Sequence, residues 1–319
     1  MLIFSLDQNT DFAQALSAEL DQPIAPHEER IFPDGERKLR PLVDPRGADV
    51  YVIQSLHGGS IESPHDKLCS LLMFIATLRE HGTGQVTAVV PYLAYARKDR
   101  QTKPYDPVSL RYVAQMFEAV GTDQVIVLEV HNVAAFQNAF RCMTQHIPVH
   151  RAFHAVAKEA AAKGPIAVAS PDPGGVKRAQ LWREFLEEQL ARPVGFAMVD
   201  KRRSAGVLSS MNLVAGDVEG ATVLLLDDLI ASGDTMLRAA TALHEAGARS
   251  VIACAAHGLF IDPASSVLLD DRIAQVVISD SVPPFRVPDG SGLRKKMHVA
   301  SSAPLFADAL RQSHGAWRR

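Results

Sequence analysis

Short runs of β-branched and aliphatic residues alternate with longer amphipathic segments along almost the whole chain of 319 residues. The short runs contain few polar residues, which is typical of strands buried on both faces of a parallel sheet. They lie at residues 50–55, 86–92, 124–130, 165–170, 222–228, 250–257 and 275–279. Alternating strands and helices predict an α/β fold with a mainly parallel sheet flanked by helices.

The longer segments between these strands have apolar residues three and four positions apart, which is the spacing of a helix with one buried face. They span residues 64–82, 107–121, 174–190 and 234–248. Three of them end at or near a glycine, which can take the left-handed conformation that often closes a helix. We therefore predict helices in these four segments.

The alternation runs through the chain twice, which predicts two similar α/β domains. Their expected limits are residues 1–147 and residues 148–302. A last apolar segment, residues 303–319, is expected to form a helix that packs on the N-terminal domain. This division also suits the length of the chain, because a single core seldom extends beyond about 250–300 residues.

Composition and charge exclude several classes of protein. With 47% hydrophobic and 22% charged residues the chain is globular, and its net charge of -3 gives no general attraction to nucleic acid or to a membrane. The first residues lack the basic start of a signal peptide, and the apolar run at residues 68–78 is too short to span a bilayer. The three cysteines are far apart, which suits a reducing compartment, so we expect a cytoplasmic protein.

Two adjacent acids, Asp227 and Asp228, stand at the end of a predicted buried strand and are followed by a turn of small residues. Ligands of parallel sheets bind at the carboxyl ends of the strands. Carboxylates accept hydrogen bonds from sugar hydroxyls, and the N–H groups at a helix N-terminus bind phosphate. Ser232 and Thr235 add hydroxyl donors. The segment indicates a sugar phosphate ligand, although the acids would also serve merely to end the strand and cap the next helix.

Three other strand ends carry polar residues suited to phosphate or metal. Four cationic side chains lie between Arg97 and Lys103, in a loop stiffened by prolines, which suits a polyphosphate but also an ordinary solvated loop. His131 follows the strand at residues 124–130 and is either a metal or phosphate ligand or simply solvated. Asp172 stands before Gly174 and Gly175 and is either an oxygen ligand for Mg²⁺ or an ordinary N-cap.

Together these segments resemble the ribose-phosphate pyrophosphokinase (PRPP synthetase) family over essentially the whole chain. The motifs that carry the resemblance occur in the family's order and are FPDGE, YARKDRQTKPYDPVS, VLEVH, SPDPGGVKRA, DKRRSAGVLSSMN and DVEGATVLLLDDLIASGDTM. The resemblance implies two phosphoribosyltransferase-type domains, with ATP bound on the N-terminal side and ribose 5-phosphate on the C-terminal side. It also implies transfer of the diphosphoryl group of ATP to O1 of ribose 5-phosphate, with Mg²⁺, giving PRPP for nucleotide biosynthesis and AMP.

The resemblance assigns roles to residues that match the motifs. Catalysis is assigned to Lys201 and Arg203, on a loop that stabilises charge during transfer. ATP binding is assigned to Phe32, Asp34, Glu36, Arg97, Lys98 and His131, and Mg²⁺ binding to His131 and Asp172. Ribose 5-phosphate binding is assigned to Arg203, Asp227, Asp228, Ala231, Ser232, Gly233, Asp234 and Thr235. Family members are commonly hexamers in which the FPDGE turn reaches a neighbouring ATP site, so the resemblance implies a homo-oligomer of hexamers or dimer units.

Four residues depart from the family pattern. Lys98 stands where Gln is usual, Glu129 where Asp is usual, and Ala231 where a polar residue is common. Asp234 replaces a small residue, usually Gly, before Thr235. A carboxylate ~4 Å from a phosphate oxygen costs about 1 kcal/mol even at the dielectric of water. Asp234 is therefore expected either to turn away and cap the helix or to weaken sugar phosphate binding.

Two other functions remain open at the level of the sequence. A regulatory paralogue with weakened catalysis would explain Asp234 and Ala231. A phosphoribosyltransferase that uses PRPP would share the sugar phosphate turn, but it would not explain the motifs at residues 32–36 and 95–109 or the duplicated α/β pattern.

Overall fold

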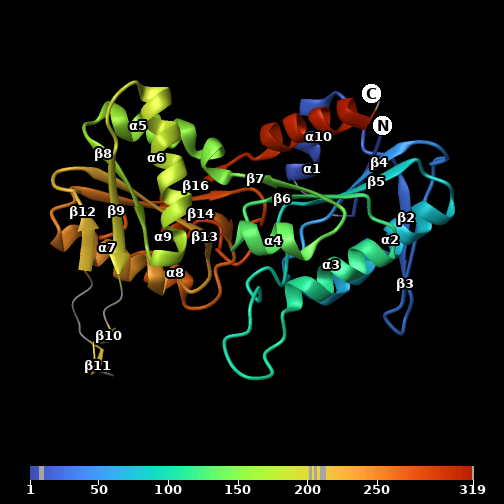
Figure 1. Cartoon of the computed structure of the whole chain (residues 1–319), viewed down its shortest axis with the longest axis horizontal. Coiled ribbons are helices and arrows are strands. Elements are labelled where there is room, and N and C mark those ends of the chain that lie inside the picture. Colours follow the sequence, from blue (N-terminus) through green and yellow to red (C-terminus); the bar gives the residue numbers. More distant parts are fainter. Residues whose placement is uncertain (7–10, 201–202, 205–206, 209–212, 318–319) are drawn as a thin grey trace. The chain divides into compact units, whose positions relative to one another are not determined.

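The computed structural model describes residues 1–6, 11–200, 203–204, 207–208 and 213–317. The chain divides into two compact units (Figure 1). Unit 1 comprises Met1–Pro148 and Ser302–Arg319, and unit 2 comprises Val149–Ser301. Each unit is built around its own mainly parallel sheet, which confirms the predicted fold class of two α/β units.

The sheet of unit 1 has five strands, and every neighbouring pair is parallel. Their order in the sheet is β1 (Leu2–Ser5), β4 (Asp49–Ile53), β5 (Gln85–Val90), β6 (Gln124–Leu128) and β7 (Met143–Ile147). The order follows the chain, so all crossovers run in one direction. Helices α2 (Pro64–Glu80), α3 (Ser109–Ala119) and α4 (Val133–Ala139) cover one face, and α1 (Asp11–Leu20) and α10 (Ala303–Trp317) the other (Figure 1).

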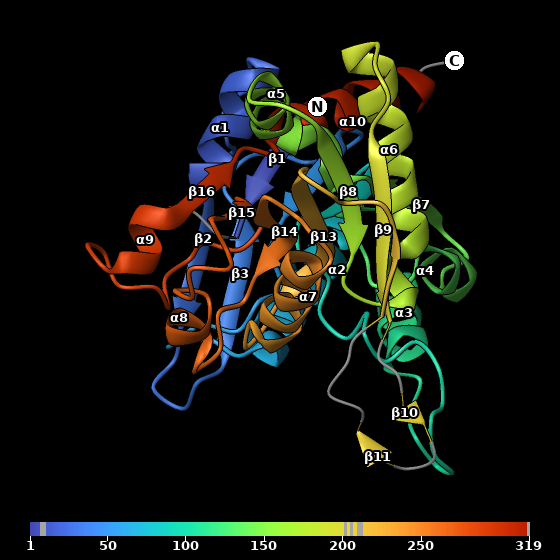
Figure 2. The same ribbon diagram turned by 90° about the vertical axis from the view of Figure 1, so that its left-hand side faces the viewer.

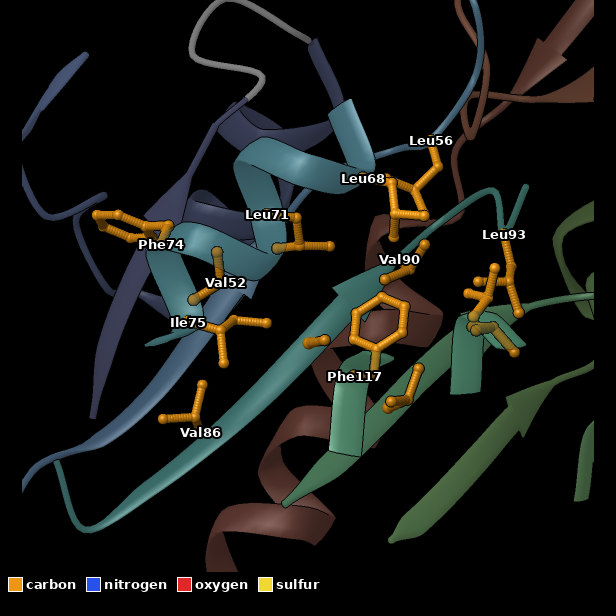
Figure 3. Close-up of a cluster of buried hydrophobic side chains, with 14 of the residues drawn as sticks. Val52, Leu56, Leu68, Leu71, Phe74, Ile75, Val86, Val90, Leu93 and Phe117 are labelled. Carbon is orange, nitrogen blue, oxygen red and sulfur yellow. The ribbon is translucent and has the colours of Figure 1, made fainter. Parts of the chain in front are cut away.

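Helix α2 shows how the sequence produces the core of unit 1. Ser63 and Asp66 form a reciprocal capping box, and Pro64 occupies the first turn, where it has no helical hydrogen bond to lose. The helix then buries a row of apolar side chains against β4, β5 and α3 (Figure 3). The labelled contributors are Val52, Leu56, Leu68, Leu71, Phe74, Ile75, Val86, Val90, Leu93 and Phe117. Burying each large side chain contributes roughly 1.5–3 kcal/mol relative to exposure.

Unit 2 has a seven-stranded sheet that is parallel except at one edge. Its order is β12 (Leu213–Gly216), β9 (Gly195–Asp200), β8 (Ile166–Ser170), β13 (Thr222–Ile230), β14 (Ser250–Gly258), β15 (Gln275–Ser279) and β16 (Met297–Ala300). Edge strand β12 is antiparallel to β9. The helical segments are η1 (Val149–Phe153), α5 (His154–Ala162), η2 (Pro173–Gly175), α6 (Val176–Leu190), α7 (Asp234–Glu245), α8 (Ala264–Val267) and α9 (Gly292–Lys296).

The two central strands of unit 2, β8 and β13, mark a switch in the winding of the sheet. From β8 the chain passes through α6 to β9 on one side, and from β13 it passes through α7 to β14 on the other. Right-handed crossovers in opposite directions place α6 and α7 on opposite faces, and the course of these elements can be followed in Figure 2. The carboxyl ends of strands at such a switch point form the usual binding crevice of an open α/β sheet.

Among the element boundaries that differ from the sequence prediction, two lie at the switch point. The strand expected at residues 222–228 extends to Ile230, because its far end still pairs with β14 through Ile230 and Gly258. The helix expected from residue 174 begins at Val176, because Asp172 first caps the separate turn η2. Within the part of the chain that the structure describes, no helix combines the length and the apolar character needed to cross a membrane.

Candidate functional site

The two adjacent acids of β13 lie beyond the end of the neighbouring strand β8. The last paired residues of β8 and β13 are Ala169 and Leu225, whereas β13 continues beside β14 past Asp227 and Asp228. Beyond Leu225, the edge of β13 that faces β8 is therefore no longer paired with β8, and the two acids lie in this part of the strand. Asp228 is only 5% exposed, and the side chain of Asp227 is 17% exposed.

Arg178, in the first turn of α6, supplies positive charge to this pair of acids. Its Nη1 lies 3.9 Å from Oδ1 of Asp227 and 3.9 Å from Oδ1 of Asp228, and its side chain is 12% exposed. Burial raises the pKa of Asp227 well above the usual aspartate value, the Asp228 carboxylate raises it further, and Arg178 partly opposes both. Asp227 is therefore protonated more readily than an ordinary aspartate, and Arg178 partly opposes this.

Asp172 organises the end of β8. Its Oδ1 accepts hydrogen bonds from the backbone N–H groups of Gly174 at 2.9 Å and Gly175 at 3.2 Å, so it caps η2. Ser170 Oγ donates to the main-chain oxygen of Asp172 at 2.6 Å. A Cβ at Gly175 would lie 2.6 Å from Ser170 Oγ, so the close turn requires glycine there. Asp172 is thus an N-cap whose second carboxylate oxygen, Oδ2, is a suitable ligand type for a hard cation.

The turn that follows β13, residues 231–235, leads into α7. Gly233 precedes the helix with φ of 86°, and a Cβ there would lie 3.0 Å from Leu268 Cγ, so both backbone angle and packing require glycine. The first N–H groups of α7 have no hydrogen-bond partner within the helix. They lie at its N-terminal end, which carries the positive pole of the helix dipole. This turn therefore has the backbone geometry of a phosphate site.

Asp234 lies inside this turn and is exposed. Its Oδ2 accepts a hydrogen bond from Ser232 Oγ at 2.6 Å, so the hydroxyl proton of Ser232 is directed to Asp234. One turn further along α7, Arg238 donates from Nε to the main-chain oxygen of Asp234 at 3.2 Å and from Nη2 to Thr235 Oγ1 at 3.4 Å. The acid and the arginine are thus bound to the same short turn.

In unit 1, the cationic loop after β5 is held in shape by Asp106. Oδ2 of Asp106 accepts from Lys98 Nζ at 2.9 Å, from Thr102 Oγ1 at 2.6 Å and N at 3.1 Å, and from Lys103 N at 3.1 Å. The hydrogen bonds from Thr102 and Lys98 lower the pKa of Asp106. Lys98 is consequently ion-paired within the loop, whereas Arg97 is exposed.

The loop after β6 is tied to the cationic loop through Asn132. Its side chain accepts from Ala135 N at 3.1 Å, which caps α4, and donates to Asp99 Oδ2 at 2.8 Å. Beside it, Glu129 is buried with φ of 35°, and its Oε1 lies 3.5 Å from His146 Nε2. His131 follows on the exposed side of this bend. Arg97, Lys98 and His131 therefore come from two connected loops at the carboxyl edge of one sheet.

Phe32, Asp34 and Glu36 form the tip of a hairpin made by β2 (His27–Ile31) and β3 (Arg37–Pro41). Phe32 exchanges backbone hydrogen bonds with Glu36 and Gly35, and Asp34 Oδ1 accepts from Glu36 N at 3.1 Å. The tip is therefore a well-formed turn that presents these side chains outward. None of these hydrogen bonds joins it to the loops after β5 and β6.

Lys201 lies outside the described residues. Arg203 is described only as part of the short strand β10 (Arg203–Ser204), which pairs with β11 (Val207–Leu208). His131 belongs to unit 1 and Asp172 to unit 2, so each is described within its own unit. No cluster of three or more His, Cys, Asp or Glu side chains suited to a metal ion occurs among the residues with described positions.

The sequence did not single out Arg178 or Arg238, which the structure places beside the two acids and beside the turn at residues 231–235. Both lie in helices that were predicted, one turn after the glycines of the SPDPGG and ASGD segments. Their distance from these glycines along the chain was the signal that could have identified them. Residues three to five positions after such a glycine lie near the N-terminus of the helix.

A cavity of about 470 Å³ lies at the opposite edge of the unit 2 sheet, where the strands begin. Its cationic lining residues are Lys163, Arg249, Lys295 and Lys296. Lys163 is the C-cap of α5, Lys295 and Lys296 end α9, and Arg249 donates to the main-chain oxygen of Lys163 at 3.1 Å. Cations at helix C-termini are favoured by the helix dipole, which accounts for this lining without an anionic ligand.

Comparisons with known proteins cover both units. Residues 1–121 match the family model of the N-terminal domain of ribose phosphate pyrophosphokinase, and residues 148–289 match that of the phosphoribosyl transferase domain. The chain is 35% identical over 316 residues to a ribose-phosphate pyrophosphokinase of Caldanaerobacter subterraneus subsp. tengcongensis, covering 98% of this chain and 94% of the relative. It is 32% identical to that of Clostridium perfringens, with 97% and 92% covered. The crystal structure of phosphoribosylpyrophosphate synthetase from Mycobacterium smegmatis superimposes with a TM-score of 0.84 at 28% identity and covers 99% of both chains.

Proposed function

Because the chain belongs to the ribose-phosphate pyrophosphokinase family, we propose that it transfers the diphosphoryl group of ATP to O1 of ribose 5-phosphate, giving PRPP and AMP. The observation that carries this proposal is the convergence at the β8–β13 switch point. There, two acids, a half-buried arginine, a capped aspartate turn and a glycine-bearing helix N-terminus meet at one sheet edge. Full-length similarity to the family supports a synthetase over a phosphoribosyltransferase, because unit 1 is included.

Different residues of unit 2 bind different parts of the acceptor, ribose 5-phosphate. Asp227 and Asp228 accept hydrogen bonds from the ribose hydroxyls, and Arg178 favours their ionised form. The backbone N–H groups after Gly233 and the hydroxyl of Thr235 bind the 5-phosphate. Binding of both the hydroxyls and the phosphate would hold the acceptor in one orientation within unit 2. Phosphoryl-type transfer depends mainly on such positioning and on charge neutralisation.

Mg²⁺ is the cation that we propose for this reaction. Asp172 presents a carboxylate whose orientation is fixed by two N–H donors, and oxygen ligands of this kind suit a hard cation. We propose Asp172, in unit 2, and His131, in unit 1, each as a ligand of Mg²⁺ or of phosphate. When bound, Mg²⁺ neutralises charge on the transferred phosphates.

Unit 1 is proposed to bind ATP. Arg97 and His131 come from two linked loops, and an exposed arginine can bind two phosphate oxygens at once. Lys98 is assigned to the same side, where its ion pair with Asp106 stabilises the loop. The outward hairpin tip with Phe32, Asp34 and Glu36 suits contact with adenine in a neighbouring subunit, so we propose a homo-oligomer. Lys201 and Arg203 are proposed to stabilise charge during transfer.

One observation favours a second candidate, a regulatory paralogue with weakened catalysis. The Ser232 hydroxyl donates to Asp234, which removes a donor from the turn and leaves a carboxylate there.

The two functions are separated by incubating the purified protein with ATP, ribose 5-phosphate and Mg²⁺ and measuring AMP and PRPP. The proposal predicts equal amounts of both products. It also predicts a loss of at least about a hundredfold in kcat for Lys201→Ala, in the range of removing one group that stabilises transition-state charge. Absence of AMP over a range of Mg²⁺ and phosphate concentrations would refute the synthetase and favour the paralogue.

A further inference from the structure

We propose that Arg238 is a specificity-determining residue for the acceptor's 5-phosphate, which supplies the positive charge that offsets Asp234. This inference rests on the proposed function, because it assumes that the turn at residues 231–235 binds a sugar phosphate. It concerns a residue outside the sugar phosphate turn and its motif.

The first step concerns the hydrogen-bond donors of the turn. Ser232 Oγ donates its proton to Asp234 Oδ2 at 2.6 Å. The hydroxyl of Thr235 is in the opposite situation, because it accepts from Arg238 Nη2 at 3.4 Å and keeps its own proton. Because Thr235 accepts from Arg238, its hydroxyl proton is left for donation to a ligand. The hydroxyl proton of Ser232 is instead donated to Asp234.

The second step concerns charge. Asp234 places an exposed carboxylate in the turn that should hold a phosphate dianion, which repels that ligand. Residues four positions apart lie on one face of a helix, and Arg238 reaches back along α7 to the main-chain oxygen of Asp234. Its guanidinium thus lies within the first turn of the helix. The pair leaves the turn with no net added charge.

The third step concerns freedom to respond to the ligand. Arg238 is exposed and is hydrogen-bonded to groups of this turn, Asp234 O and Thr235 Oγ1. Guanidinium groups bind phosphate oxygens through two parallel N–H donors, and this one is already beside the turn. A 5-phosphate in the turn would accordingly be attracted by Arg238 and repelled by Asp234. The affinity for the acceptor would then depend on the difference between these two interactions.

The test is calorimetric binding of ribose 5-phosphate to the whole chain, with KM and kcat measured on the same samples. Arg238→Leu should raise the Kd about tenfold and raise the KM for ribose 5-phosphate in parallel. The kcat and the KM for ATP should change less than about twofold. Arg238→Lys should recover most of the affinity, because it keeps the charge.

The decisive comparison is the double variant. Asp234→Gly alone should tighten binding several-fold. Arg238→Leu in the Asp234→Gly background should cost about threefold or less, because the repulsion it offsets is gone. A loss of equal size in both backgrounds would overturn the proposed compensation. Lys158→Leu removes one exposed positive charge from α5 and serves as the matched control, with an expected change below twofold.

Failure of the two proposals gives different results. If the wild-type chain binds no ribose 5-phosphate, the proposed function itself is refuted. If the wild type binds it and Arg238→Leu binds it equally well, only the role of Arg238 is refuted. Thermal unfolding of each variant identifies loss of folding, and Arg238→Lys then remains as the second test of charge.

Discussion

At the scale of single residues, Asp227 and Asp228 show that a binding group can oppose the stability of the strand that carries it. Two carboxylates stand side by side at a poorly exposed position, and burial raises the pKa of Asp227. Arg178 offsets part of this cost from 3.9 Å away. Such strain persists where the function of the group requires it.

Asp227→Asn should therefore stabilise the protein at neutral pH. Because folding raises this pKa, the aspartate contributes stability that is fully present below the ordinary pKa of about 3.9 and is lost as pH rises through the folded-state value. Asparagine imitates the protonated form and does not titrate. We expect a gain in unfolding free energy on the order of 1 kcal/mol at neutral pH that vanishes in acid, measured by urea unfolding across pH.

The same variant should bind ribose 5-phosphate about tenfold more weakly, since it loses a charged acceptor for a ribose hydroxyl. Asp289→Asn, at a side chain that is 95% exposed, is the control and should change stability by less than about 0.5 kcal/mol. A wild type that is the more stable protein at neutral pH would contradict this account.

Which residues could be recognised from the sequence depended on how locally their role is encoded. Asp227 and Asp228 were recognisable because two acids interrupt a run of buried residues. Arg178 was not, because its place beside them follows from the packing of α6 on β8 and β13. The bond between Ser232 and Asp234 was also missed, since the sequence suggested only capping or repulsion.

At the scale of elements, the loop after β5 is shaped by its own side chains before any ligand binds. Asp106 gathers four donors from Lys98, Thr102 and Lys103. A loop with a fixed shape loses less conformational entropy when it binds a polyphosphate.

Asp106→Ala should release this loop and raise the KM for ATP about five- to tenfold. The KM for ribose 5-phosphate should change little, because that site is assigned to unit 2. Steady-state kinetics with each substrate varied in turn checks the expectation, and Glu80→Ala, at an exposed position at the end of α2, is the control. Equal increases in both KM values would show that Asp106 acts on overall folding instead.

The alternation of strands and helices was predictable because both periodicities are strong in long, buried elements. Edge strand β12 was not predicted, since its four residues are mostly exposed and carry no alternating pattern. The turn η2 was absorbed into the predicted helix, because the proline and glycines that start it also fit a helix N-terminus.

At the scale of the whole molecule, the last helix of the chain completes the first unit. Helix α10 packs on α1, and the ring of Phe306 lies 5.1 Å from that of Phe12 in an edge-to-face arrangement. Ser313 Oγ donates to Gln124 Oε1 at the start of β6, and His314 Nδ1 lies 3.2 Å from Asp49 Oδ2 at the start of β4. Unit 1 therefore depends on contacts between segments about 300 residues apart in the chain.

Phe306→Ala should destabilise the fold by about 3–5 kcal/mol, because it removes a fully buried ring and leaves a cavity. Urea unfolding measures the change. Asp308→Ala, on the exposed side of the same helix, should cost less than about 0.5 kcal/mol. A loss for Phe306→Ala as small as that for Asp308→Ala would mean that α10 contributes little packing to unit 1.

The central claim is the transfer of an intact diphosphoryl group, and the fate of the β-phosphorus of ATP tests it most directly. The protein is incubated with Mg²⁺, ribose 5-phosphate and ATP radiolabelled at that position, and the products are separated. We expect the label in PRPP, in the diphosphate attached to O1, with unlabelled AMP formed in equal amount. Label recovered in ADP would show transfer of a single phosphoryl group, and label remaining in ATP would show no transfer; either result would contradict the proposed function.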